Sequence, residues 1–372
     1  MKRNGVTVAH DSGWNGPHSG GPYAGPPPPG WGGGWMPPPP PPPKPGVIPL
    51  GPLGLGDILG GTFTTMGRYW KQLFGIAVLM YGGALLVVVG AVAVALSATH
   101  DTLQTVFDST NDEDPPWDEL WTLLISFGAV WIVAMLSMVV ATATIMAACP
   151  AVLQDAVLGR RTTIGAVWRR AWPRVPAVIG AMLLPWLVAM VTMGLFMVSY
   201  VVLIVSFLSQ DTSGAWAALG FVAFLAFVPL AVWLWVRFSL APAAVVFESQ
   251  GPVAALRRSS QLVQGAWWRI FGITVLASIM AMVAGYIIQL PLTMIGALTS
   301  MPGMAEAGPE PGVGEALVAM GSYLVFILLG SIISQIVATT FPQLVTGLLY
   351  VDQRIRKENL APVLAEAAAD RY

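Results

Sequence analysis

Six long apolar stretches constrain this chain more than any other feature. None of them contains a Lys, Arg, Asp, Glu or His residue, and each reaches the ~20 residues that a helix needs to cross a bilayer. Charged residues make up 10% of the chain, against roughly 25% in soluble proteins. The sequence therefore predicts an all-α membrane protein with six transmembrane helices, at about residues 73–98, 121–147, 176–207, 216–236, 270–298 and 317–341.

The charges predict which side of the membrane each connection occupies. In the six-span arrangement, all 18 Lys and Arg residues lie in the N-terminal segment, the second and fourth connections and the C-terminal segment, whereas the first, third and fifth connections carry only acids. Short basic segments remain on the cytoplasmic side. We therefore expect a multi-pass protein of the bacterial cell membrane with both termini in the cytoplasm and without a cleaved signal peptide.

The sequence predicts three successive parts of the chain. Residues 1–50 form a Pro/Gly-rich arm that includes seven consecutive prolines, Pro37 to Pro43, and has tryptophans spaced along it. Such a composition predicts disorder, with the proline run in polyproline II form. The arm is either a solvated tail or a docking segment for a cytoplasmic protein partner with an aromatic groove. The six-span membrane domain follows at residues 51–350, and a cytoplasmic tail at residues 351–372.

Internal repetition predicts how the spans are grouped. RYWKQLFGIAVL precedes the first span, RRAWPRVPAVIG the third and GAWWRIFGITVL the fifth. CPAVLQDAVLG and APAAVVFESQG, which follow the second and fourth spans, share a proline and a final glycine. We therefore expect three similar two-helix hairpins, each preceded by an amphipathic helix, in one common orientation. Pseudo-threefold packing of the hairpins is a hypothesis that follows.

The amphipathic helices are predicted to lie at the inner membrane interface. In residues 252–272, apolar residues recur at helical spacing and the arginines lie largely elsewhere on the helix. This pattern is typical of a helix that turns its bases toward anionic lipid headgroups. The predicted interface anchors are Trp70, Lys71, Trp172, Arg174, Arg257, Arg258, Trp268 and Arg269.

Residues for metal binding or nucleophilic catalysis are sparse. His10 and His18 lie in the arm, His100 ends the first span, and Cys149 is the only cysteine. These residues cannot form a catalytic triad or a zinc site within the membrane, and the acids of the first connection are explained by topology. We expect no cofactor, no bound metal, no nucleic-acid partner and no enzymatic activity.

Polar groups inside the spans are neutral. Gln289 lies in the fifth span, and Ser334, Gln335 and Thr339 lie in the sixth. Gly330, Ser334 and Ala338 form a small-residue series that permits close helix packing, with Gln335 able to donate across the contact. Alternatively, these polar groups line a neutral pathway or lipid-facing cleft, bounded by Pro185, Pro229 and Pro291.

Three segments carry a resemblance to a known family: PLGLGDILGGTFTTMGRYWKQLFGIA, RFSLAPAAVVFESQGPVAALRRSSQLVQGAWWRIFGI and LLYVDQRIRKENL. Over about residues 50–360 the chain resembles uncharacterised bacterial membrane proteins grouped with the glycerophosphoryl diester phosphodiesterase membrane-domain superfamily. The resemblance implies a multi-span membrane domain without an established activity. The phosphodiesterase activity belongs to a separate catalytic barrel, for which this chain has no segment of sufficient length.

Three functional hypotheses remain open at this stage. The first is a non-enzymatic protein that organises or anchors partner proteins through its arm and contacts lipids through its bases. The second is a carrier or permease for a neutral or lipidic molecule. The third is a lipid-acting enzyme that would use a carboxylate such as Asp155 or Glu248. A polar cleft at Gln289 and Gln335 would favour the carrier, and a tightly packed interior would favour the organiser.

Overall fold

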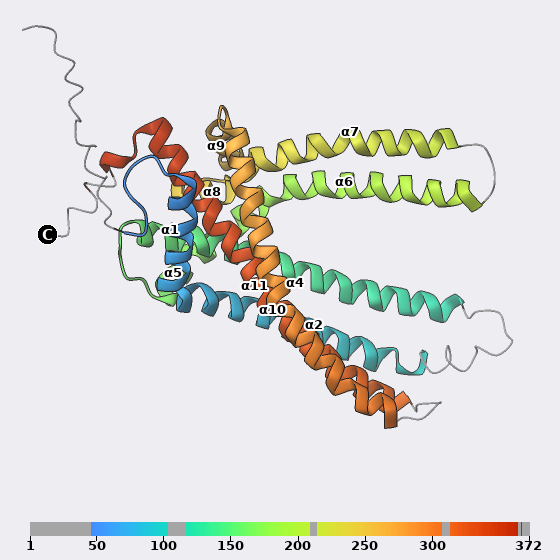
Figure 1. Ribbon diagram of the computed structural model, residues 1–372. Coiled ribbons are helices and arrows are strands. Elements are labelled where there is room, and N and C mark those ends of the chain that lie inside the picture. Colours follow the sequence, from blue (N-terminus) through green and yellow to red (C-terminus); the bar gives the residue numbers. More distant parts are fainter. Residues whose placement is uncertain (1–45, 103–116, 209–213, 307–312, 364–365, 367–372) are drawn as a thin grey trace, which may run out of the picture. The chain divides into compact units, whose positions relative to one another are not determined.

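The computed structural model describes residues 46–102, 117–208, 214–306, 313–363 and 366 (Figure 1). The described residues are helical and contain no strand, and six helices are long and apolar enough to cross a membrane. The predicted fold class is therefore confirmed. The first 45 residues of the predicted arm and the acidic segment 103–116 lie outside the described residues.

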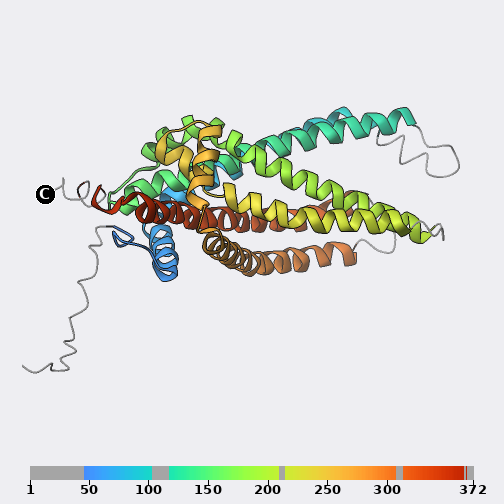
Figure 2. The same ribbon diagram turned by 90° about the horizontal axis from the view of Figure 1, so that it is seen from above.

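Three pairs of long helices form the hairpins. α2 (Trp70–Ala98) packs on α4 (Trp117–Val157), α6 (Val175–Leu208) on α7 (Gly214–Phe238), and α10 (Trp267–Glu306) on α11 (Val313–Glu358). The two helices of each pair are joined by one of the three connections that contain no Lys or Arg. Figures 1 and 2 show the three pairs converging at one end and separating from one another toward the other.

Shorter helices gather where the hairpins converge. They are α1 (Leu55–Arg68), α5 (Ile164–Ala171), α8 (Ala241–Glu248) and α9 (Pro252–Val263), with a 3-10 turn, η2 (Trp172–Arg174), between α5 and α6. Short helices α1, α5 and α9 each precede the first long helix of a hairpin, as the repeats predict. We call this region, with the adjoining ends of the long helices, the polar end.

The three units contact one another cyclically at the polar end. Each unit consists of one short helix and the hairpin that follows it. α5 of the second unit packs on α4 of the first, α9 of the third packs on α8 at the end of the second, and α1 of the first packs on α11 of the third. Since each short helix covers the end of the preceding unit, the contacts close a ring. This arrangement favours the hypothesis of pseudo-threefold packing.

Small side chains allow the helices to meet closely at the core of this ring. Ala147, Ala148 and Ala151 of α4 and Ala243 and Ala244 of α8 are buried. Without bulky side chains the backbones can approach one another, which is how membrane helices gain packing energy. The apolar residues of the hairpins away from this core are largely exposed, as expected for surfaces that face lipid.

Two domain boundaries in the structure differ from the predicted ones. Residues 46–50 belong to the packed domain rather than to the arm, because Val47 and Ile48 are buried and the Val47 N–H donates to the Ala156 carbonyl at 3.2 Å. A Cβ at Gly46 would lie 2.3 Å from that same carbonyl oxygen, so only glycine fits there. At the other end, α11 continues to Glu358 without a break at residue 350.

The long helices also exceed the predicted spans. α11 has 46 residues, which corresponds to about 69 Å of helix, more than twice the roughly 30 Å hydrocarbon core of a bilayer. The extra turns lie at the polar end, where α11 carries Asp352, Arg354 and Glu358. Hydropathy located the apolar part of each helix but could not show that the helix continues into polar sequence.

Candidate functional site: a polar end and an intramembrane cavity

One carboxylate stands near the end of each unit, at its contact with the next unit. The three are Asp155 of α4, Glu248 of α8 and Asp352 of α11, and their side chains are only 13%, 15% and 0% exposed. Buried carboxylates require compensating charge or hydrogen bonds. For each carboxylate, at least one hydrogen-bond donor belongs to the segment at the start of a different unit.

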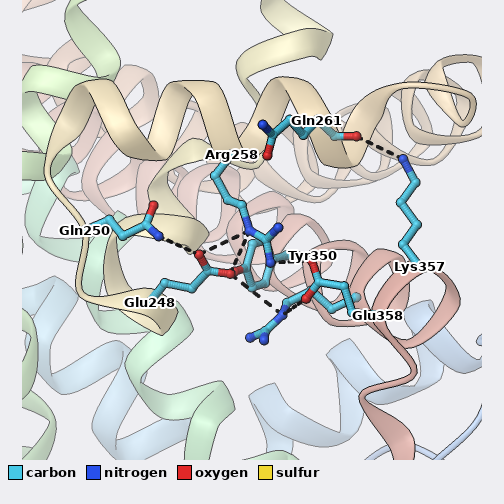
Figure 3. Close-up of polar contacts among 8 residues, drawn as sticks. Glu248, Gln250, Arg258, Gln261, Tyr350, Lys357 and Glu358 are labelled. Atoms are coloured by element: carbon cyan, nitrogen blue, oxygen red, sulfur yellow. Dashed lines mark hydrogen bonds and ion pairs between the residues drawn. The ribbon is translucent and has the colours of Figure 1, made fainter.

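Glu248 has partners in α9, in α11 and in the turn between α8 and α9 (Figure 3). The Arg258 Nε of α9 donates to both carboxylate oxygens at 2.9 and 3.1 Å, and Gln250 Nε2 donates at 2.9 Å. The Tyr350 hydroxyl of α11 also donates to this carboxylate. Arg258 in turn forms an ion pair with Glu358 of α11. The cluster thus joins α8, α9 and α11.

Burial and neighbouring charges have opposite effects on the pKa of Arg258. Burial lowers the pKa of its guanidinium, but hydrogen bonds to Glu248 and the negative charges of Glu248 and Glu358 raise it by more, so the pKa lies above its ordinary value. Arg258 therefore remains charged at any physiological pH, and the cluster functions as a fixed ionic link.

Asp352 links the start of the first unit to the third. Its carboxylate accepts from the Leu53 N–H at 2.9 Å and from Arg356 Nε at 2.9 Å, and forms an ion pair with Arg269. Both arginines also donate to the Leu53 carbonyl, at 2.7 and 2.8 Å. Both polar groups of the Leu53 backbone are thereby satisfied, although Leu53 itself is fully buried.

Asp155 makes the corresponding contact between the first and second units. Arg170 of α5 donates to it at 3.2 Å and to the Ala151 carbonyl at 3.2 Å. Arg174 connects the second unit internally, since it donates to the Ser249 hydroxyl at 2.6 Å and to the Val245 carbonyl. All three carboxylates thus have basic partners that stabilise the ring, and within the described ranges no cluster of His, Cys, Asp and Glu could hold a metal ion.

The predicted interface anchors fall into two groups. Trp70, Trp172 and Trp268 are 55%, 45% and 77% exposed at the polar end, and Lys71 and Arg257 are exposed as well. Their role at the headgroups stays a prediction. By contrast, Arg174, Arg258 and Arg269 point into the protein. The sequence interpretation missed their partners because Glu248, Ser249 and Asp352 lie far from them in sequence or in another repeat.

A second feature lies along α10 and α11 and extends to the neighbouring hairpins. A cavity of about 500 Å³ is lined by residues of α10 and α11. A cavity of about 290 Å³ adjoins it, because Ser278 and Pro342 line both, and the second is also lined by residues of α4, α6, α7 and α8. We call these two spaces together the central cavity. Their volumes are in or near the range of sites for small organic ligands.

The polar residues predicted within the spans are only partly brought together. Gln289 and Ser334 both line the central cavity, whereas Gln335 and Thr339 are not among its lining residues. Thr339 instead accepts from the Tyr81 hydroxyl at 3.3 Å and donates to the Gln335 carbonyl. Of the three prolines predicted to bound a cleft, Pro185 lines the cavity, and Pro229 and Pro291 do not.

Close helix packing explains why Ser334 reaches the cavity wall. A Cβ at Gly285 of α10 would lie 2.5 Å from the Ser334 hydroxyl oxygen, and a Cβ at Gly330 of α11 would lie 3.3 Å from Leu292. The small residues on the two helices thus face each other. They let α10 and α11 approach closely beside the cavity.

Sequence reasoning missed several cavity residues, although one signal was present. Polar residues of α10 that line the central cavity are spaced by three, four or eight positions, which places them on one face of a helix. That stripe consists of Thr274, Ser278, Tyr286, Gln289 and Thr293. Gln343 and Thr346 of α11 also line the cavity, but they follow the predicted end of the sixth span and were therefore not considered.

Comparison with known proteins gives a family without a described activity. The model of a domain of unknown function, DUF7847, matches residues 74–344, which is most of the chain. The chain belongs to the DUF7847 family. The match begins in α2 and ends in α11 of the DUF7847 protein, and it includes the residues that line the central cavity except Thr346. No curated protein and no solved structure matches it significantly, and the resemblance to the glycerophosphoryl diester phosphodiesterase superfamily stays a prediction.

Proposed function

We propose that this DUF7847 protein is a non-enzymatic membrane carrier that takes up a neutral or lipidic molecule between its hairpins. The observation that supports this proposal is the central cavity, whose walls combine apolar side chains with the neutral polar groups of Gln289, Ser334 and Gln343. The pairing of Asp155, Glu248 and Asp352 with bases favours a structural role for these acids over a catalytic one.

We also propose that the protein resides in the bacterial cell membrane with its polar end toward the cytoplasm. The distribution of bases supports this orientation, because Arg160, Arg161, Arg237 and Arg257 belong to the polar end or the helix ends beside it. Exposed bases near anionic lipids each contribute roughly 1 kcal/mol of attraction. Under this proposal the ligand enters from the cytoplasmic leaflet, where the hairpins converge.

Transport can be tested in liposomes that contain the purified protein. A fluorescent neutral lipid, such as an NBD-labelled diacylglycerol analogue, is placed in one leaflet, and its movement is followed by quenching from outside. Ser278→Phe should fill the junction of the two spaces and slow the movement several-fold. Ile279→Phe is the matched control, because Ile279 is the next residue on α10 and is 48% exposed. Equal rates for both variants and for protein-free liposomes would argue against a carrier.

A second candidate function rests on the arm. Tryptophans interleaved with prolines in residues 1–45 favour docking to an aromatic groove of a cytoplasmic protein. Under this alternative the protein organises partners at the membrane. Co-purification with full-length protein, but not with a variant that lacks residues 2–45, would support the alternative. If deleting the arm changes no co-purifying protein, this function is rejected.

A further inference from the structure

One buried hydroxyl in the wall of the central cavity has no hydrogen-bond partner. Thr274 of α10 is 3% exposed, lines the smaller part of the cavity, and its Oγ1 atom pairs with no group in the described part of the chain. A buried hydroxyl without a partner is destabilising. In this conformation the hydroxyl oxygen is fully covered, but Thr274 lines the cavity, so a rotation of its side chain about χ1 would let a ligand supply the partner.

Other polar groups of neutral character lie along the same wall. Ser278, one turn along α10, donates its hydroxyl to the Thr274 carbonyl at 2.9 Å, so its oxygen remains available as an acceptor. Gln343 adds a side-chain amide, which both donates and accepts. Pro342 lacks an N–H, so the carbonyl of Ala338, which also lines the cavity, cannot receive the usual helical bond from residue 342.

The lining excludes a charged headgroup. None of the residues described as lining the central cavity is Lys, Arg, His, Asp or Glu. Transfer of a phosphate or carboxylate into such surroundings is very unfavourable without a counter-charge. Arg170, Arg258 and Arg269 are engaged at the polar end with Asp155, Glu248 and Asp352, and Arg237, next to the lining residue Phe238, lies over the Trp233 ring.

An apolar groove continues from the cavity along the second hairpin. A space of about 470 Å³ between α6 and α7 shares Pro185, Ala189 and Trp235 with the smaller part of the cavity. Apart from Thr192, whose hydroxyl donates to the Val188 carbonyl, its lining is apolar. Such a groove suits a hydrocarbon chain whose polar head lies at Thr274.

The depth of Thr274 fits this arrangement. Thr274 follows Trp267, the first residue of α10, by seven positions, which corresponds to about 10 Å along the helix. If Trp268 lies at headgroup level, the Thr274 hydroxyl lies beyond the interfacial layer of roughly 5–7 Å, in the outermost part of the hydrocarbon core.

We propose that the central cavity binds a neutral amphiphile, with a hydroxyl, ester or amide head hydrogen-bonded at Thr274 and its chain in the groove between α6 and α7. This inference rests on the proposed function for the location of the ligand, but it concerns binding and headgroup selection rather than transport. Diacylglycerols and long-chain alcohols have the required chemistry. Lipids with phosphate headgroups are excluded from the cavity.

The test uses full-length protein in phosphatidylcholine liposomes and two photoactivatable probes. A diazirine-tagged diacylglycerol and a phosphatidic acid with identical chains differ only in the headgroup, and crosslinked peptides are identified by mass spectrometry. The diacylglycerol should label peptides of α6, α7 and α10, and the phosphatidic acid should label them several-fold less. Equal labelling of the cavity by both probes would overturn the inference.

Two variants separate ligand binding from folding. Thr274→Val should reduce diacylglycerol labelling about five-fold, the effect of one lost hydrogen bond. Thr340→Val is the matched control: its hydroxyl is also buried without a partner among the described residues, but Thr340 does not line the described cavities. Since neither change removes a hydrogen bond within the protein, both variants should fold. Unchanged labelling of Thr274→Val, or an equal loss in Thr340→Val, would contradict the assignment.

The outcomes also distinguish this inference from transport. Selective labelling without lipid movement in the liposome assay would reject the carrier and retain the binding site. Lipid movement without selective labelling would retain the carrier and reject Thr274 as the headgroup site.

Discussion

At the scale of single residues, burial determines which bases hold the protein together. Arg257 and Arg258 are neighbours in α9 with the same chemistry, yet Arg257 is exposed while the Arg258 side chain is 23% exposed and contacts Glu248 and Glu358. An exposed base contributes little to stability, whereas removal of one partner from a largely buried pair leaves an uncompensated charge. Two adjacent arginines therefore have different roles.

This difference can be measured with one substitution at each position. Arg258→Ala should lower the free energy of unfolding by roughly 2 kcal/mol, because Glu248 and Glu358 lose one of two shared basic partners while retaining Arg354 and some contact with water. Arg257→Ala should change it by less than about 0.5 kcal/mol. Thermal unfolding of the purified variants in one detergent gives the comparison. Similar shifts in both variants would show that the ionic cluster is not a stabilising link.

Arg257 has a separate expected effect on lipid binding. Its exposed position at the polar end leaves it available to anionic headgroups, so Arg257→Glu should weaken association with phosphatidylglycerol without lowering the unfolding temperature. Native mass spectrometry of lipid adducts, with wild-type protein as the reference, measures this association. Retention of the same number of anionic lipids would remove Arg257 from the interface anchors.

At the scale of helices, close packing of small residues positions α10 against α11. Gly285→Val should destabilise this pair, because a side chain there would meet Ser334. Gly272→Val is the matched control on the same helix, since a Cβ at Gly272 would meet nothing within 4 Å. Both variants carry the same change in helix propensity. We expect an unfolding temperature several degrees lower for Gly285→Val only, and an equal decrease in both would exclude packing as the cause.

The long and short helices were largely predictable from sequence, but their ends and partners were not. Runs without charge identify spans because the hydrocarbon core excludes ionisable groups, and this criterion found all six. The sixth span was nevertheless ended at Phe341, before Pro342, although no charged residue follows until Asp352, so Gln343 and Thr346 were overlooked. Ionic partners such as Arg258 and Glu358, 100 positions apart in the third unit, meet only because α9 packs against the end of α11. Periodicity along one helix carries no information about such contacts.

At the scale of the whole molecule, topology determines from which leaflet a ligand enters. Ser19→Cys and Ser109→Cys place single reporters in the predicted cytoplasmic arm and the predicted external first connection. Cys149 is fully buried, so it should give little background. In intact cells an impermeant thiol reagent should label residue 109 and leave residue 19 unlabelled until the cells are opened. The reverse pattern would invert the orientation and with it the proposed route of entry.

The three units, the ionic ring and the central cavity together give the central claim, that the hairpins line a site for a neutral amphiphile. The most direct measurement is native mass spectrometry of the protein released from its own membrane, with the bound molecule identified by fragmentation. We predict one retained neutral lipid per chain, which is lost from Thr274→Val and kept by Thr340→Val. Protein that carries no lipid, or only phosphate-bearing lipids that both variants retain, would contradict the claim.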